Sequence, residues 1–231
     1  MTGIALAAAA VGFTNAAMPA LAAADFFPAL DALPGIRAAF LTRIPGIDVA
    51  AEREAALVNL QPVHDALVAE LGFTPPAFAE QIHGSLVSVA DRPALHPAAD
   101  GLATATPGIA LGIYVADCAA IYLVDPRHRA IALVHSGRKG TEANILGEAV
   151  ATLRDEFGTD PANIVAVVSP CIRPPHYEID FAATIAAQAR AAGIGAFHDA
   201  GTCTAAHPER YYSYRREQGK TGRMLALLML Q

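Results

Sequence analysis

The chain has 231 residues, of which 54% are hydrophobic and only 16% are charged. So much apolar surface excludes an intrinsically disordered protein, and a net charge of −6 argues against a general nucleic-acid-binding surface. The three cysteines are too few and too scattered for a disulfide scaffold, which favours a reduced, cytoplasmic protein.

Residues 1–24 carry no charged side chain and are rich in alanine. The run resembles a secretion signal, but it lacks the basic segment with which such signals begin. Asn15 and Pro19 interrupt it as a membrane span. We therefore expect an Ala-rich extension over residues 1–24 and one domain over residues 25–231, with no membrane partner and with secretion as the less favoured alternative.

The first half of the domain combines a helix with short strands. Residues 49–71 have helical periodicity, and we expect Pro62 to break or kink this helix before Gly72 ends it. A strand is expected at 84–90, where polar and apolar residues alternate. Buried strands are indicated by short apolar runs between turn residues, at 109–116, 119–124 and 130–135.

The second half alternates helices with strands. Thr141 is expected to cap a helix that ends at Phe157. A strand is expected at 163–168, then a helix at 180–192 that ends at Gly193, and a final strand in MLALLML. Strand pairs alternate with single helices, which favours an α+β fold over a Rossmann fold: a single domain of mixed β-sheets with interleaved and flanking helices.

The chemistry is concentrated around the hairpin formed by the strands 119–124 and 130–135. If its turn closes on Pro126 and Arg127, Cys118 lies directly opposite His135. Side chains opposed in this way have Cβ atoms about 4.5–5.5 Å apart. A looser register would place the two residues on opposite faces of the sheet.

Such a pair supports three interpretations. With a further imidazole, Cys118 and His135 would form a His₂Cys metal site with an open fourth position, as in catalytic zinc sites. Without a metal, His135 could activate the Cys118 thiolate as a nucleophile. The third interpretation is a buried cysteine beside a hydrogen-bonded core histidine.

The turn that follows His135 favours a functional site. Residues 136–141 contain two glycines and two cations, and they lead into the N-terminus of a helix. Exposed backbone amides beside cations form an anion site, which suggests chemistry with phosphate.

Segments in a fixed order resemble the laccase-domain family, long labelled multicopper polyphenol oxidase. They cover nearly all of residues 34–231, and their order is a stronger signal than any one of them. The matching segments are Gly35–Arg43, Gln81–Gly84, Asp100–Thr104, Val115–Cys118, His135–Thr141, Ser169–Ile172 with Tyr177 and Glu178, Cys203 and Thr204, and Tyr212–Arg216 with Gly222 and Arg223.

This resemblance implies a zinc-dependent purine nucleoside phosphorylase that also deaminates adenosine; some members are described as peptidoglycan editing factors. The ligands it implies for one zinc ion are His83, Cys118 and His135. Asp100 and Asp117 are expected to act as acid or base or to bind ribose. Phosphate is expected to bind the cations Arg43, Arg138, Lys139 and Arg215.

The sequence also departs from the family. The usual aromatic and arginine after the second histidine are replaced by Arg138 and Lys139. Residues 44–58 are too short for the usual glycine-rich loop, and Ser169 replaces a glycine. We expect metal binding to survive these changes, and the choice of substrate to be the property they affect.

The alternatives come from other classes of protein. They are a cysteine or zinc amidase that edits peptidoglycan precursors, a polyphenol oxidase with a single copper, and a binding protein with a degraded site. Eight histidines with no His-x-His pair exclude a cluster of four coppers, although copper could occupy a single His₂Cys site adventitiously.

The remaining thiols and imidazoles are expected to be structural or solvated. Cys171 and Cys203 have no neighbouring base in the sequence. His64 is expected to be a surface or capping group of its helix. Among the loop histidines, His176 is expected to come nearest to the site.

Overall fold

The computed structural model describes residues 23–231, so the expected extension lies outside the described residues except for its last two. Ala23 and Ala24 are buried in the core. In the part of the chain that is described, no helix is long and apolar enough to cross a membrane.

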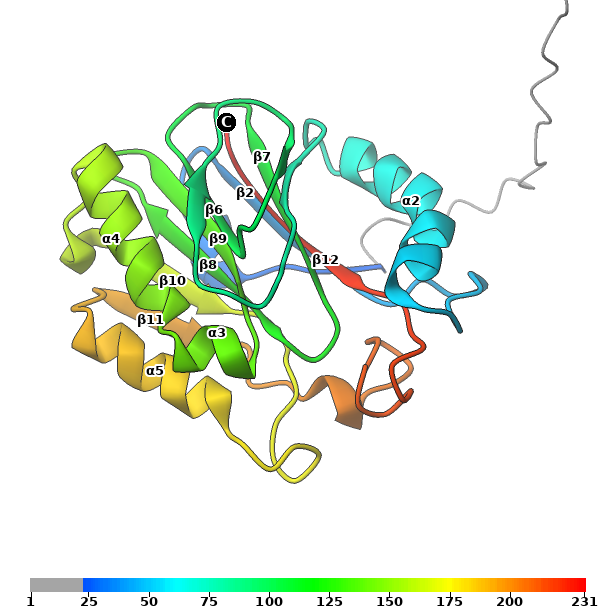
Figure 1. Ribbon diagram of the computed structural model, residues 1–231. Helices are drawn as coiled ribbons and strands as arrows, with labels where there is room; N and C mark the ends of the chain where they lie inside the picture. Colours follow the sequence, from blue (N-terminus) through cyan, green and yellow to red (C-terminus); the bar gives the residue numbers. More distant parts are fainter. Residues whose placement is uncertain (1–22) are drawn as a thin grey trace, which may run out of the picture.

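Within residues 23–231, twelve strands form two six-stranded mixed sheets (Figure 1). In spatial order, the first sheet consists of β1 (Ala24–Asp25), β2 (Ile36–Leu41), β12 (Met224–Leu230), β7 (Ala110–Val115), β3 (Ala77–Ala79) and β5 (Leu95–His96). The second consists of β11 (Ala196–Asp199), β10 (Val165–Val168), β8 (Ala119–Asp125), β9 (Ala130–Ser136), β6 (Gly101–Thr104) and β4 (Val87–Val89). The expected α+β class with mixed sheets is confirmed.

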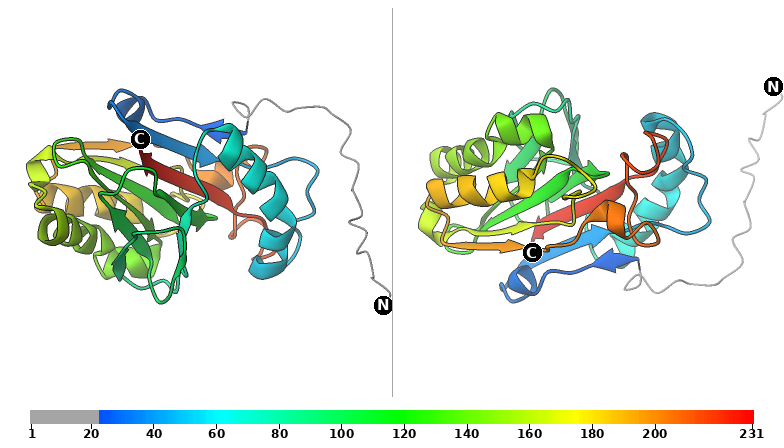
Figure 2. Two further views of the ribbon diagram at one scale, coloured as in Figure 1. Left: turned by 90° about the horizontal axis from the view of Figure 1, so that it is seen from above. Right: turned by 90° about the horizontal axis from the view of Figure 1, so that it is seen from below.

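Five α-helices and two short 3-10 helices complete the described structure. The α-helices are α1 (Pro28–Asp31), α2 (Arg53–Glu70), α3 (Arg138–Glu142), α4 (Ile145–Phe157) and α5 (Phe181–Ala191). The 3-10 helices are η2 (Pro161–Asn163) and η3 (Thr204–Ala206). Figure 2 shows α4 and α5 together on one side of the molecule and α2 apart from them.

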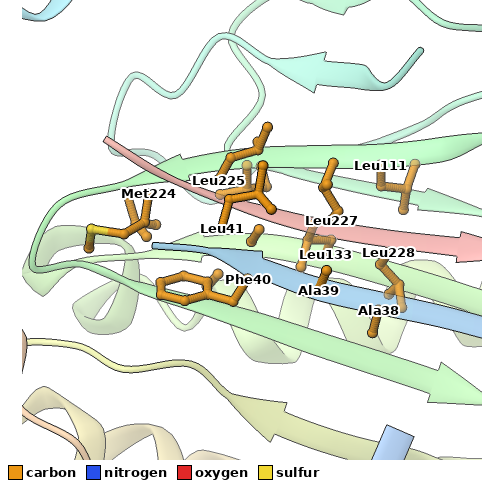
Figure 3. Packing of buried hydrophobic residues seen from close by; sticks show 14 of the residues in the cluster. Ala38, Ala39, Phe40, Leu41, Leu111, Leu133, Met224, Leu225, Leu227 and Leu228 are labelled. Carbon is orange, nitrogen blue, oxygen red and sulfur yellow. The ribbon is translucent and has the colours of Figure 1, made fainter. Parts of the chain in front are cut away.

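The hydrophobic core is divided between two clusters because the second sheet is covered on both faces. One cluster joins the two sheets, with leucines of β2, β12 and β7 packing near Leu133 of β9 (Figure 3). The other fills the space between the second sheet and the helices α4 and α5. Every residue of β8, β9 and β12 is buried, which explains why these strands appear in the sequence as continuous apolar runs.

Two details of the expected helices differ. Helix α2 runs through Pro62, so the expected break does not occur, and the alternative of a kink at this proline stays a prediction. Thr141 does not cap the long helix either, because it lies in the short helix α3. The cap of α4 is Asn144, whose side chain accepts a hydrogen bond from the backbone N–H of Gly147.

The expected register of the central hairpin is also wrong. His135 pairs with Ala120, so that Cys118 comes opposite Gly137. The turn is two residues longer than expected, because the Asp125 carboxylate accepts the backbone N–H groups of Arg127 and His128, and Arg129 adopts a left-handed conformation with φ of 51°. A shift of two residues preserves the face, so Cys118 and His135 still lie on the same side of the sheet.

Candidate metal centre

Three side chains from separate segments meet at one end of the hairpin. His83 follows β3, Cys118 precedes β8, and His135 lies in β9. One ligand atom from each lies within 4.8 Å of the other two, and among the described residues this is the only such group of three. The two imidazole rings meet edge to face, with centroids 4.9 Å apart.

Backbone geometry places each of these ligands. His83 has a φ of 66° and Asp117, the neighbour of Cys118, has a φ of 80°; both values are unusual for residues other than glycine. Gly137 is required opposite Cys118, because a Cβ atom there would lie 2.5 Å from the Cys118 sulfur. The left-handed conformation of Asp117 thus turns the chain directly before Cys118, whose thiol projects toward the imidazoles of His83 and His135.

Asp100, which directly precedes β6, contacts the segments of both histidines. Its Oδ1 accepts the backbone N–H of His83 at 2.9 Å and lies 2.9 Å from Nδ1 of His135, while its Oδ2 accepts the backbone N–H of Gly84 at 2.6 Å. Burial favours a higher pKa for this carboxyl, but these hydrogen bonds outweigh it and lower the pKa. Asp100 has no exposed surface, and its carboxylate contacts both histidine segments; its role as acid or base or in ribose binding stays a prediction.

The electrostatics favour a thiolate next to a protonated imidazole. Burial favours a higher pKa for Cys118, but the charge and hydrogen bonds of His135 and His83 lower it to about 6. Burial lowers the pKa of His135, but Cys118 and Asp100 outweigh it and raise the value to about 9. A cation that displaces the shared proton would therefore meet a thiolate that is already formed.

The donor set fits a zinc ion. Two imidazole nitrogens and one thiolate form the His₂Cys combination, which leaves one tetrahedral position open. His83 is exposed, Cys118 is half-buried and His135 is buried, so His83 is the most accessible of the three side chains. The Asp100–His135 bond is the kind of carboxylate contact that orients a metal-binding histidine.

A pocket of about 760 Å³ opens onto these residues. Its cationic lining residues are Arg53, Arg138, Arg215 and Arg223, its acidic ones are Glu52, Glu54 and Asp117, and its aromatic ones, apart from the histidines, are Tyr114, Tyr177, Phe181 and Tyr214. The ring of Tyr114 stacks on Phe78 at 5.2 Å. The Gln81 side-chain amide holds the backbone of Tyr114 through two hydrogen bonds. Its Oε1 accepts the Tyr114 N–H at 3.0 Å, and its Nε2 donates to the Tyr114 carbonyl at 2.6 Å.

The four cations predicted to bind phosphate are found in different surroundings. Arg138 and Arg215 line the pocket, but each is paired with a glutamate, Glu142 at 2.8 Å and Glu178 at 2.9 Å respectively. Arg43 and Lys139 are not among the lining residues. The Arg43 guanidinium donates to both carboxylate oxygens of Glu217 at 2.8 Å, so its charge is already neutralised.

Asp117 lies in the pocket wall and is saturated with hydrogen bonds. Its carboxylate accepts the hydroxyls of Thr204 and Ser213 and the backbone N–H of Arg215. Burial raises the pKa of this carboxyl in spite of those bonds. Asp117, which directly precedes Cys118, thereby ties the segment 204–215 to the metal centre, and its role as acid or base stays a prediction.

The pocket cations that the sequence analysis missed are Arg53 and Arg223. Within residues 23–231 neither forms an ion pair, and Arg223 is only 8% exposed. Burial, followed by the positive charge of Arg53, lowers the pKa of Arg223. Arg223 belonged to a motif that resembled the family, but nothing in its local sequence indicated that it would lack a carboxylate.

His64, expected at the surface, is buried beneath the pocket wall. It is 1% exposed, its ring stacks on Tyr114 at 5.8 Å, and neither ring nitrogen has a hydrogen-bond partner among the described residues. Burial lowers its pKa to about 4, so His64 is neutral at physiological pH.

Comparison with known proteins gives consistent results. The chain matches the family described as multi-copper polyphenol oxidoreductase laccase over residues 46–188 and 176–231. It is 34% identical to a purine nucleoside phosphorylase of Deinococcus radiodurans over 71% of this chain and 74% of that one. It is 30% identical to the purine nucleoside phosphorylase SCO2081 of Streptomyces coelicolor, over 69% and 78% of the two chains.

Solved structures show the same fold. The crystal structure of YlmD from Geobacillus stearothermophilus superposes with a TM-score of 0.74 at 24% identity, over 89% of this chain and 94% of that one. The protein YfiH from Bacillus licheniformis gives a TM-score of 0.75 at 23% identity, over 85% and 93%.

Proposed function

Because the chain belongs to the multi-copper polyphenol oxidoreductase laccase family, and because relatives in that family are named purine nucleoside phosphorylases, we propose that it cleaves purine nucleosides with phosphate. The observation that carries this proposal is the combination of a His₂Cys ligand set with two unpaired arginines in one pocket. We propose one metal ion per chain, zinc, at His83, Cys118 and His135.

We propose that Arg53 and Arg223 hold the phosphate. Two like charges near one another, one of them buried, are unfavourable unless an anion neutralises them. A guanidinium binds phosphate through paired hydrogen bonds. Within the described residues neither Arg223 nor Arg53 forms an ion pair with a carboxylate, in contrast to Arg43, Arg138 and Arg215, although Glu52 and Glu54 line the same pocket.

In the proposed reaction a phosphate oxygen forms a bond to the anomeric carbon of ribose as the bond from that carbon to the purine breaks. The bonding electrons leave with the base, which takes up a proton, and positive charge develops on the sugar as in glycoside cleavage. The aromatic rings that line the pocket offer flat faces for the base. A zinc ion bound at the three ligands would supply a Lewis acid to a substrate group in its open position.

The experiment that tests this function uses zinc-loaded protein with inosine, in the presence and absence of phosphate, and separates the products by chromatography. We expect hypoxanthine and ribose 1-phosphate in equal amounts, and neither without phosphate. Adenosine is a parallel substrate: adenine indicates phosphorolysis, whereas inosine formed without phosphate would indicate a deaminase. Absence of all these products would contradict the proposal.

The phosphate assignment has its own test in Arg223→Gln. A hydrogen bond to a charged group contributes about 1.5–3 kcal/mol, so its loss should raise the KM for phosphate at least tenfold. The KM for inosine should change little. The matched control is Arg216→Gln, which removes an arginine from the same segment but not from the pocket lining. Equal effects of the two substitutions would contradict the assignment.

A further inference from the structure

A second group of thiols lies outside the metal centre. Cys171 follows β10 and Cys203 precedes η3, and the two residues pair as an isolated parallel bridge. The backbone N–H of Cys171 donates to the carbonyl of Thr202, and the N–H of Thr204 donates to the carbonyl of Cys171, both at 3.2 Å. Paired backbones lie about 4.7–4.9 Å apart. This separation is within the Cα range of about 4.4–6.8 Å that a disulfide requires.

The two side chains share one environment but differ in accessibility. Both belong to the cluster between the second sheet and the helices, where Cys171 is fully buried and Cys203 is partly exposed. His176, an exposed residue, has its Nδ1 3.6 Å from the sulfur of Cys203. Cys203 therefore has the neighbouring base that the sequence analysis did not find, and it is the thiol of the pair that a dissolved reagent can reach.

We propose that Cys203 and Cys171 form a thiol–disulfide exchange site for low-molecular-weight disulfides. His176 accepts the proton of Cys203, and the thiolate attacks one sulfur of the small disulfide. This forms a mixed disulfide and releases one small thiolate. Cys171 then attacks the sulfur of Cys203, and its proton passes to the second small thiolate as that thiolate leaves. In total, two protein thiols are oxidised to one disulfide and one small disulfide is reduced to two thiols.

The position of the pair connects this exchange with the metal centre. Ile172, the residue after Cys171, donates its backbone N–H to the carbonyl of Asp117 at 2.8 Å. Thr204, the residue after Cys203, donates its hydroxyl to the Asp117 carboxylate at 2.6 Å. A disulfide would join the two segments that hold Asp117 next to Cys118. The exchange itself does not depend on the reaction at the metal centre.

The test treats the full-length, zinc-loaded protein with oxidised glutathione, alkylates the remaining thiols without reduction and digests with trypsin. Trypsin does not cleave before proline, so the three cysteines fall on three peptides, 54–127, 155–190 and 191–210. We expect the peptides 155–190 and 191–210 to appear cross-linked, with two glutathione molecules released per chain. A wild-type protein that shows no adduct and no cross-link would overturn the proposal, as would a glutathione adduct on 191–210 that never resolves.

Three variants separate the steps. Cys171→Ala should retain glutathione on peptide 191–210, and Cys203→Ala should form neither adduct nor cross-link. His176→Gln should slow the first step about tenfold or more, since the base is lost. Its matched control is His207→Gln, which removes an exposed histidine that pairs with Glu209 instead of Cys203. Equal rates for the two histidine variants would overturn the role of His176.

Discussion

Oδ1 of Asp100 lies 2.9 Å from Nδ1 of His135, in a contact that is buried on both sides. The carboxylate accepts the Nδ1 proton, which leaves Nε2 of His135 free to bind a cation. Because the same oxygen also accepts the backbone N–H of His83, one carboxylate fixes two of the three ligands. The candidate metal centre therefore comprises four residues: three that we propose as ligands, and Asp100, which positions two of them.

The first prediction concerns the substitution Asp100→Asn. It removes the negative charge and one of the acceptors while it preserves the shape of the side chain. Contacts of this kind contribute about 10–100-fold to metal affinity, so we expect zinc to bind that much more weakly. Competition with a chromophoric chelator measures the change, and circular dichroism verifies the fold.

The matched control for this substitution is Asp125→Asn. Asp125 contacts Nδ1 of His128 at 2.7 Å, at the turn end of the same hairpin, so the substitution breaks a similar pair away from the site. Zinc affinity should stay at the wild-type value in this variant. If both variants lose affinity equally, Asp100 has no special part in the centre.

The second prediction is the pH dependence of zinc binding. With the pKa of Cys118 lowered to about 6 and that of His135 raised to about 9, the pair holds one proton between these values. Zinc must displace that proton, so affinity should rise about tenfold per pH unit from pH 7 to 8.5 and level off above pH 9. Calorimetry in buffers of different ionisation enthalpy should detect about one proton released at pH 7.5. A proton release of zero at that pH would contradict the paired state.

The third prediction is that Gly137→Ala damages the centre through Cys118. The added methyl group would lie 2.5 Å from the Cys118 sulfur, so either the thiol or the strand must move. We expect loss of zinc binding and a lower melting temperature of the metal-free protein. With cobalt in place of zinc, the sulfur-to-metal absorption band should be absent.

The double variant Gly137→Ala with Cys118→Ala provides the control for this prediction. If the methyl group acts on the sulfur, removal of the sulfur should restore most of the melting temperature that Gly137→Ala loses. If the two losses simply add, the effect of Gly137→Ala has another origin.

The extent to which the fold can be predicted depends on the range of the interactions. Buried strands were predicted because continuous apolar runs such as MLALLML are a local signal. The hairpin register was not, because it depends on how the Asp125 carboxylate and Arg129 shape the turn. The sequence pattern places the cap of α4 at Thr141, because the short helix α3 that precedes α4 leaves no distinct pattern of its own.

In the candidate site too, local signals are predictable from the sequence and long-range contacts are not. His83, Cys118 and His135 were identified from motifs, and they do converge in space. Whether an arginine is available for a ligand, however, depends on partners far away in the chain. Arg43 is neutralised by Glu217, 174 residues later, whereas Arg223 has no carboxylate partner in the described residues. Sequence patterns do not contain such pairings.

The fourth prediction concerns the buried, unpartnered His64. Its pKa is lowered to about 4 in the folded protein, against about 6.5 when unfolded, so the unfolded chain binds the extra proton between these values. The free energy of unfolding should therefore fall as the pH drops below 6.5. From pH 7 to pH 5 this one group should account for about 2 kcal/mol.

The variant His64→Phe isolates that contribution because it preserves the ring on Tyr114 and removes the titration. Urea unfolding of both proteins at pH 7 and pH 5 gives the measurement. The variant should lose about 2 kcal/mol less than the wild type over this range. Identical losses would show that His64 does not titrate as its burial requires.

The central claim is that a single metal ion at His83, Cys118 and His135 supports the cleavage of purine nucleosides. The most direct measurement removes metal with a chelator and then titrates zinc back while phosphate-dependent release of hypoxanthine from inosine is followed. The account predicts that activity rises linearly and reaches a plateau at one zinc per chain, and that Cys118→Ala stays inactive throughout. Full activity of the metal-free protein, or of the folded Cys118→Ala variant, would contradict it.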